Sequence, residues 1–353
     1  MKLTERYQHI SAVLDRLDFH ALYDGFRRYR FALYTTQEVC LDGQRFPYQP
    51  EFIGNTAIQY QGEFIAIWNV ESDPTDDEER LAASIVHEMF HCHQFTGGEM
   101  RFPSDLAILA HPDTLEGFAM QHRENLCLAD AFERNDQNQF HQFAAIRRVR
   151  RRANPALTEE ELKTETIEGI AEAVGMKALR SLNTEKYRRV VNQYLEILRA
   201  MDERLLNARR MAYHTGAIWF LYMEQQEIPI TNDFRSAQTA YDQNIMDGST
   251  AEKADDVKPD QWLVQVYREQ REKQQAKITS LLARHTMHSC NAEICGYDPM
   301  NQFRIGDLLY CSHFVRLREK KETWQLFSEV VLKMVPGSEN HVLGYAAAPD
   351  ARS

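Results

Sequence analysis

The residues with the clearest capacity for chemistry form the pattern His87-Glu88-Met89-Phe90-His91. On an α-helix, residues four apart lie on one face, so His87 and His91 can share one tetrahedral metal ion. Glu88 lies beside them and can serve as the base that takes a proton from water. Residues 81–86 contain no glycine or proline, which favours a helix here. The pattern predicts a zinc site for metal-assisted hydrolysis.

Catalytic zinc usually has a third protein ligand. Gln94 and Gly97 stand where an extended histidine motif requires glycine and histidine, so that source of a ligand is excluded. A glutamate from a later helix is the other source. The candidates are Glu116 and Glu168, which stand in similar Thr-x-Glu-Gly segments, and Glu124.

Sequence context separates the two similar segments. Glu116 follows Asp113 at a helix start, where an acidic residue already has a capping role. Glu168 lies in the third turn of a helix that we expect to begin near Thr158, beside an apolar stripe, so its carboxylate needs a cationic partner. Gly169 permits close approach of another backbone. We therefore favour Glu168 and keep Glu116 as the alternative.

A second carboxylate strengthens this choice. Glu172 is one turn beyond Glu168 and can accept the free N–H of a ligand histidine. Met120, which has the equivalent place after Glu116, cannot.

The combination of HExxH with the later segment Glu168-Gly169-Ile170-Ala171-Glu172 resembles the gluzincin zinc metallopeptidases. The resemblance implies one Zn²⁺ per chain, with His87, His91 and Glu168 as its ligands and Glu88 as the base. It implies Glu172 as the acidic residue beside the ligands and a peptide or protein as the substrate. The gap between His91 and Glu168 is longer than in most members, and Glu116 fits the usual spacing better.

The resemblance also implies a zincin-like fold, in which the edge strand of a small sheet pairs with an extended substrate. The candidate edges are Glu63–Val70 and its hairpin partner Ala57–Gln61. An ordinary core strand is the competing interpretation of either segment.

Hydrolysis also needs a donor to the developing oxyanion. Tyr213 and His214, which precede an apolar run at 218–221, are candidates, although both can also be core residues with satisfied polar tips. A non-catalytic, peptidase-like zinc-binding module for regulation or peptide binding is the alternative function.

The elements that position these residues are mostly helical. Hydrophobic periodicity predicts an α+β chain with an N-terminal helical stretch over 1–30, a small sheet before the HExxH helix, a central helical bundle and a short C-terminal β region. We expect a zincin-like catalytic domain over 1–285 and a β-rich subdomain over 286–353. The expected helices are 78–95, 114–132, 138–152, 158 to beyond 174, 185–226 and one ending near 284, with a polar loop at 230–260.

Charge and composition exclude other classes. The 353 residues carry 41 Lys and Arg against 52 Asp and Glu, a net charge of 41 − 52 = −11, which argues against nucleic acid as the main partner. We interpret the basic run 147–152 as a solvated helix face. No apolar window is long enough to span a membrane, and the first twenty residues lack a signal-peptide pattern, so we expect a cytoplasmic protein with reduced cysteines. Cys290, Cys295, Cys311 and His313 are too loosely spaced to indicate more than a weak second zinc site.

Overall fold

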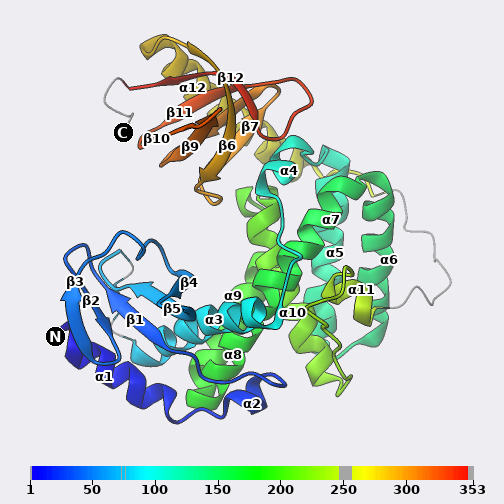
Figure 1. Cartoon of the computed structure of the whole chain (residues 1–353). Coiled ribbons are helices and arrows are strands. Elements are labelled where there is room, and N and C mark those ends of the chain that lie inside the picture. Colours follow the sequence, from blue (N-terminus) through cyan, green and yellow to red (C-terminus); the bar gives the residue numbers. More distant parts are fainter. Residues whose placement is uncertain (1, 73, 76, 246–256, 349–353) are drawn as a thin grey trace.

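A computed structural model describes residues 2–72, 74–75, 77–245 and 257–348. In these residues an N-terminal sheet and a C-terminal sheet lie on either side of a bundle of helices (Figure 1). The expected mixed α and β class, mostly helical with two separate sheets, is confirmed at this level. Among the described residues, no helix combines the length and the apolar character needed to cross a bilayer.

The N-terminal sheet has the strand order β3-β2-β1-β5-β4, and β1 runs parallel to β5. Helices α1 and α3 pack on one face, where Phe31, Leu33, Ala66 and Trp68 join the main core. The opposite face closes over a second core around Phe52. The strands are β1 (Phe31–Tyr34), β2 (Glu38–Leu41), β3 (Gln44–Pro47), β4 (Thr56–Tyr60) and β5 (Glu63–Asn69).

This strand order decides which candidate strand is the edge. The prediction of Glu63–Val70 as the edge is wrong, because β5 pairs with β1 on one side and β4 on the other. The prediction of Ala57–Gln61 corresponds to β4, which ends the sheet.

The helices form a bundle in which α8 packs between α3 and α10. This packing brings residues far apart in sequence to one place. The helices are α1 (Leu3–Leu14), α2 (Phe19–Leu22), α3 (Glu78–Gly97), α4 (Asp105–Ala110), α5 (Leu115–Arg134), α6 (Gln137–Ala153), α7 (Pro155–Thr164), the π-helix η1 (Glu165–Gly169), α8 (Ile170–Leu182), α9 (Thr184–Leu198), the 3₁₀-helix η2 (Glu203–Leu206), α10 (Ala208–Gln225) and α11 (Ala240–Asn244).

Three expectations about these helices were wrong. The predicted helix over 185–226 is two helices, α9 and α10, separated by η2. The helix expected to start at Thr158 starts at Pro155, because the Asn154 side chain accepts a hydrogen bond from the Leu157 amide and caps it. The loop expected over 230–260 contains α11, and its residues 246–256 lie outside the described ones.

The C-terminal part consists of α12 (Gln261–Arg284) and a seven-stranded antiparallel sheet of order β10-β9-β6-β12-β11-β8-β7. Ile278 and Leu281 of α12 pack on this sheet. The boundary at 285/286 therefore falls between a helix and a sheet that share a core, and the division there stays a prediction. The strands are β6 (His288–Tyr297), β7 (Gln302–Ile305), β8 (Leu308–Cys311), β9 (Val315–Glu319), β10 (Glu322–Leu326), β11 (Val330–Met334) and β12 (His341–Ala347).

Candidate metal centre

Helix α3 carries the two histidines. Its first turn is capped by Asp77, whose carboxylate accepts a hydrogen bond from the Arg80 amide, and it ends at Gly98 in the left-handed conformation. His87 and His91 are one turn apart on the face that meets α8, and their Nε2 atoms are 3.0 Å apart. The two ring nitrogens thus point toward one position.

Glu168 completes the group. Its Oε2 lies 3.6 Å from Nε2 of His87 and 3.3 Å from Nε2 of His91. In the described part of the chain, this is the one group of three potential ligands found close enough to hold a metal ion. Glu116, the alternative, is exposed in the first turn of α5, and Glu124 is buried in ion pairs with two arginines.

The three separations fit a metal ion. Ligand atoms about 2.1 Å from a tetrahedral zinc lie about 3.4 Å apart, and the observed distances of 3.0, 3.3 and 3.6 Å bracket this value. Two imidazole nitrogens and one carboxylate oxygen are also a donor set that zinc accepts. The spacing of these three atoms therefore fits zinc.

Each histidine has a partner that directs its proton away from this position. Nδ1 of His91 is 2.8 Å from Oε1 of Gln94, whose amide nitrogen donates to the Ile167 carbonyl at 3.0 Å. Because this amide oxygen can only accept, Nδ1 of His91 donates, and in the neutral ring the lone pair is therefore on Nε2. Nδ1 of His87 lies 3.5 Å from Glu172, as the sequence predicted. Both histidines thus point Nε2 toward the shared position, where a metal cation could replace the Nε2 proton.

Gln94 and Tyr194 belong to the candidate site, and the sequence analysis missed both. Gln94 entered only as a mismatch to another motif, although its position three residues after His91 places it on the same helix face. Tyr194, which lies on α9, donates a hydrogen bond of 2.6 Å to Oε2 of Glu172, and no sequence signal linked these two residues. This hydrogen bond holds the carboxylate of Glu172, which faces His87.

Glu168 is positioned by a wide helical turn. Residues 165–169 form a π-helix, a rare turn that is frequent at functional sites. There Gly169 meets Gly216 of α10 with their backbones in contact, so that a Cβ on Gly169 would lie 2.5 Å from Gly216 Cα. The close approach expected at Gly169 is thus present, and it brings α10 against the turn that carries Glu168.

A buried ionic cluster anchors the same turn. Both carboxylate oxygens of Glu165 accept from Arg147 at 2.7 Å, and Thr215 and Trp219 donate to them at 2.7 and 2.9 Å. The expectation that the basic run is solvated is wrong for Arg147 and Arg150, which are both 3% exposed. They face inward because α6 packs against α5 and α7, whose carboxylates Glu124 and Glu161 pair with them.

Burial and charge set the protonation of the centre. Burial lowers the pKa of His87, but the charges of Glu172, Glu168 and Glu88 outweigh it and raise that pKa to about 9. Burial also raises the pKa of Glu88, while His87 and His91 hold the pKa of Glu168 well below its usual range. Carboxylates that favour protons on the histidines also favour a metal cation between them.

The two proposed oxyanion donors differ in their surroundings. Tyr213 accepts a hydrogen bond from Arg209 at 3.2 Å, and the same guanidinium lies 3.3 Å from Oε1 of Glu168. Burial and the charge of Glu168 raise the pKa of Tyr213, so it keeps its proton. His214 donates from Nδ1 to the Arg210 carbonyl at 2.8 Å and stacks on Tyr194. Tyr213 therefore borders the candidate ligand Glu168 through Arg209, and His214 packs on Tyr194.

The cysteines of the C-terminal region form no second centre among the described residues. The Cys290 thiol faces the Val342 carbonyl and the Cys295 thiol faces the Arg316 carbonyl, whereas Cys311 is buried in β8. Each of the three cysteines thus has its contacts within the C-terminal sheet rather than with another cysteine.

Comparisons of the chain with protein-family models, with curated proteins and with solved structures gave no match.

Proposed function

We propose that the chain is a zinc-dependent peptidase that hydrolyses peptide bonds. The observation that carries this proposal is the convergence of His87, His91 and Glu168 at tetrahedral spacing, next to the buried carboxylate of Glu88. When bound, zinc supplies the Lewis acidity that polarises a carbonyl and makes water a stronger acid.

The residues of this chain divide the remaining work. Glu88 takes a proton from the attacking water and passes it to the leaving amine. Its raised pKa, caused by burial, makes it a better base than an exposed carboxylate. Tyr213 keeps its proton and accepts from Arg209, so its hydroxyl can donate to the oxygen of the reacting carbonyl.

Strand β4 is our candidate for binding the substrate backbone. It contacts α3 and pairs with β5 alone among the described strands, so its outer edge can hydrogen-bond an extended peptide. Figure 1 shows β4 on the side of the sheet that faces the bundle. Backbone pairing of this kind holds a peptide largely independently of its side chains.

The cysteines support our proposal that the protein works in the cytoplasm. All six are free thiols, and four of them are buried. Free buried thiols are typical of a reducing compartment.

Metal analysis of three purified proteins tests the proposed function. We expect about one zinc per chain in the parent, retained by the control Glu116→Gln and lost from Glu168→Gln, because only Glu168 lies beside the histidines. Loss of zinc from Glu116→Gln instead would move the third ligand, and a parent that takes up no zinc would refute the metal site.

Peptide hydrolysis then tests the chemistry. Glu88→Gln should keep its zinc and lose about 10²–10⁴-fold in the rate of cleavage of a peptide library, because the base is removed and the ligands remain. A Glu88→Gln protein that cleaves as fast as the parent would refute the role of Glu88.

A further inference from the structure

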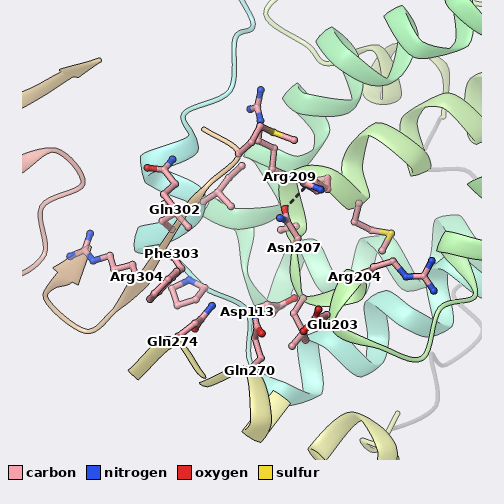
Figure 2. Close-up of a pocket in the computed structure, with 18 of the residues that line it drawn as sticks. Asp113, Glu203, Arg204, Asn207, Arg209, Gln270, Gln274, Gln302, Phe303 and Arg304 are labelled. Carbon is pink, nitrogen blue, oxygen red and sulfur yellow. Dashed lines mark hydrogen bonds between the residues drawn. The ribbon is translucent and has the colours of Figure 1, made fainter. Parts of the chain in front are cut away.

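A cavity of about 660 Å³ lies between the helical bundle and the C-terminal sheet. Its walls come from α4, the segment η2–α10, α12 and the strand β7 with the loop before it. Figure 2 shows Asn207 and Arg209 on one side, Gln270 and Gln274 of α12 below, and the β7 residues Gln302 to Arg304 opposite. This volume lies within the roughly 300–1,000 Å³ of typical ligand sites.

The cavity is positively charged in a chain whose net charge is −11. Two of its carboxylates are neutralised, since Asp105 pairs with Arg209 and Asp113 with Arg150. The cationic lining residues are Arg204, Arg209, Arg210, Arg271, Lys277 and Arg304, against the carboxylates Asp105, Asp113 and Glu203.

Four of these cations have no carboxylate partner in the described part of the chain: Arg210, Arg271, Lys277 and Arg304. Two are held in place by backbone carbonyls. Arg304 donates to Gly306 and Ser338, and Arg271 donates to Arg304 at 3.3 Å. The cavity therefore presents fixed positive groups that an anionic ligand can neutralise.

The wall of this cavity is also the wall of the metal centre. Arg209 lines the cavity and contacts Glu168, a proposed zinc ligand, at 3.3 Å. His214 lines it as well and stacks on Tyr194, which holds Glu172 against His87. The side chain of Arg209 therefore lies between Glu168 and the cavity.

We propose that this cavity binds the carboxylate side chains of an acidic segment of the peptide substrate, an inference that rests on the proposed peptidase function. Amide side chains line the cavity beside the cations, and they can both donate to and accept from a peptide backbone. They are Asn207, Gln270, Gln274 and Gln302.

Fluorescence anisotropy with a short labelled peptide of alternating glutamate and alanine tests this proposal. The full chain carries Glu88→Gln so that the probe is not consumed. In this background, Arg210→Gln with Arg271→Gln should weaken binding by about tenfold or more, because two charge-assisted hydrogen bonds are lost. The matched control, Arg188→Gln with Arg268→Gln, removes two exposed cations outside the cavity and should change binding less than about twofold.

A probe in which glutamine replaces glutamate should bind weakly to all three proteins. Equal binding of the acidic probe to the cavity variant and to the control variant would overturn the proposal, as would no binding to any of them. Zinc content is measured on the parent in parallel. Zinc without charge-dependent binding refutes the cavity alone, whereas charge-dependent binding without zinc refutes the peptidase and keeps an acidic-peptide site.

Discussion

The contact between Gly169 and Gly216 gives a direct test of how Glu168 is positioned. In Gly169→Ala the new methyl group would lie 2.5 Å from Gly216 Cα and 2.9 Å from its carbonyl carbon, where ordinary Cβ contacts are 3.4–4 Å. Both neighbours are backbone atoms, so no side-chain rotation can relieve the clash. Helix α10 and the π-turn must therefore separate by at least 3.4 − 2.5 = 0.9 Å.

A separation of this size has a calculable cost. Thr215 and Trp219 of α10 donate to Glu165 at 2.7 and 2.9 Å, and adding 0.9 Å stretches these bonds to 3.6 and 3.8 Å, beyond hydrogen-bond range. Overpacking costs about 1–3 kcal/mol, and each lost bond to a charged group costs about 1.5–3 kcal/mol. Because these terms overlap, we expect a loss of about 3 kcal/mol or more in the free energy of unfolding.

Urea denaturation of Gly169→Ala, together with zinc titration, measures both consequences. Zinc affinity should fall about 10–100-fold, because Glu168 directly precedes the substituted residue. The control is Gly306→Ala, where no atom lies within 4 Å and only the left-handed backbone at φ +57° costs about 1–2 kcal/mol. If Gly169→Ala were no less stable than Gly306→Ala and bound zinc like the parent, the reasoning would be refuted.

Three further predictions concern the residues around the centre. Gln94→Leu should lower zinc affinity about 10–100-fold in a metal titration, because His91 loses the acceptor for its Nδ1 proton; unchanged affinity would contradict this role. Arg147→Met should cost about 3–5 kcal/mol in urea denaturation, because it leaves Glu165 buried without its cation and removes one of the two cations of Glu124, and a loss below about 1 kcal/mol would contradict the cluster. Burial raises the pKa of Glu161 from 4.5 to about 7, so this group favours the folded state at low pH and its contribution is lost as the pH rises from 4.5 through 7, by up to about 1 kcal/mol per pH unit. Glu161→Gln should remove this part of the pH dependence of unfolding, and an unchanged pH profile would show that Glu161 is ionised throughout.

Local signals predicted the helix that carries the two histidines and the acidic residues that face it. The bounds of α3 follow from Asp77 as the cap and the glycines at its end, and both are short-range features. Glu168 was preferred over Glu116 because Glu116 already has a capping role at a helix start, whereas Glu168 has no such local role. The structure places Glu168 beside the histidines and leaves Glu116 exposed in the first turn of α5.

What the sequence could not predict depends on contacts between distant segments. The π-turn at 165–169 is accompanied by a contact between Gly169 and Gly216, about fifty residues later. The hydrophobic periodicity of a single helix cannot predict such a contact. Arg147 and Arg150 looked solvated because a run of arginines usually is, and only the carboxylates of α5 and α7 make their burial tolerable. The cavity likewise draws its walls from segments more than a hundred residues apart.

The π-turn has a consequence for how this protein tolerates length changes. Its wide turn lets Glu165 reach the arginine cluster while Glu168, three residues later, reaches the histidines. Deleting one residue between 165 and 169 would replace the wide turn by an ordinary α-helical turn, and Glu165 and Glu168 would no longer keep their present spacing around the helix. Either the cluster or the metal ligand would then lose its partner. Homologous chains that lack one residue at this point should therefore have lost the proposed third ligand, even where HExxH persists, and an alignment gap here would mark lineages without the proposed metal centre.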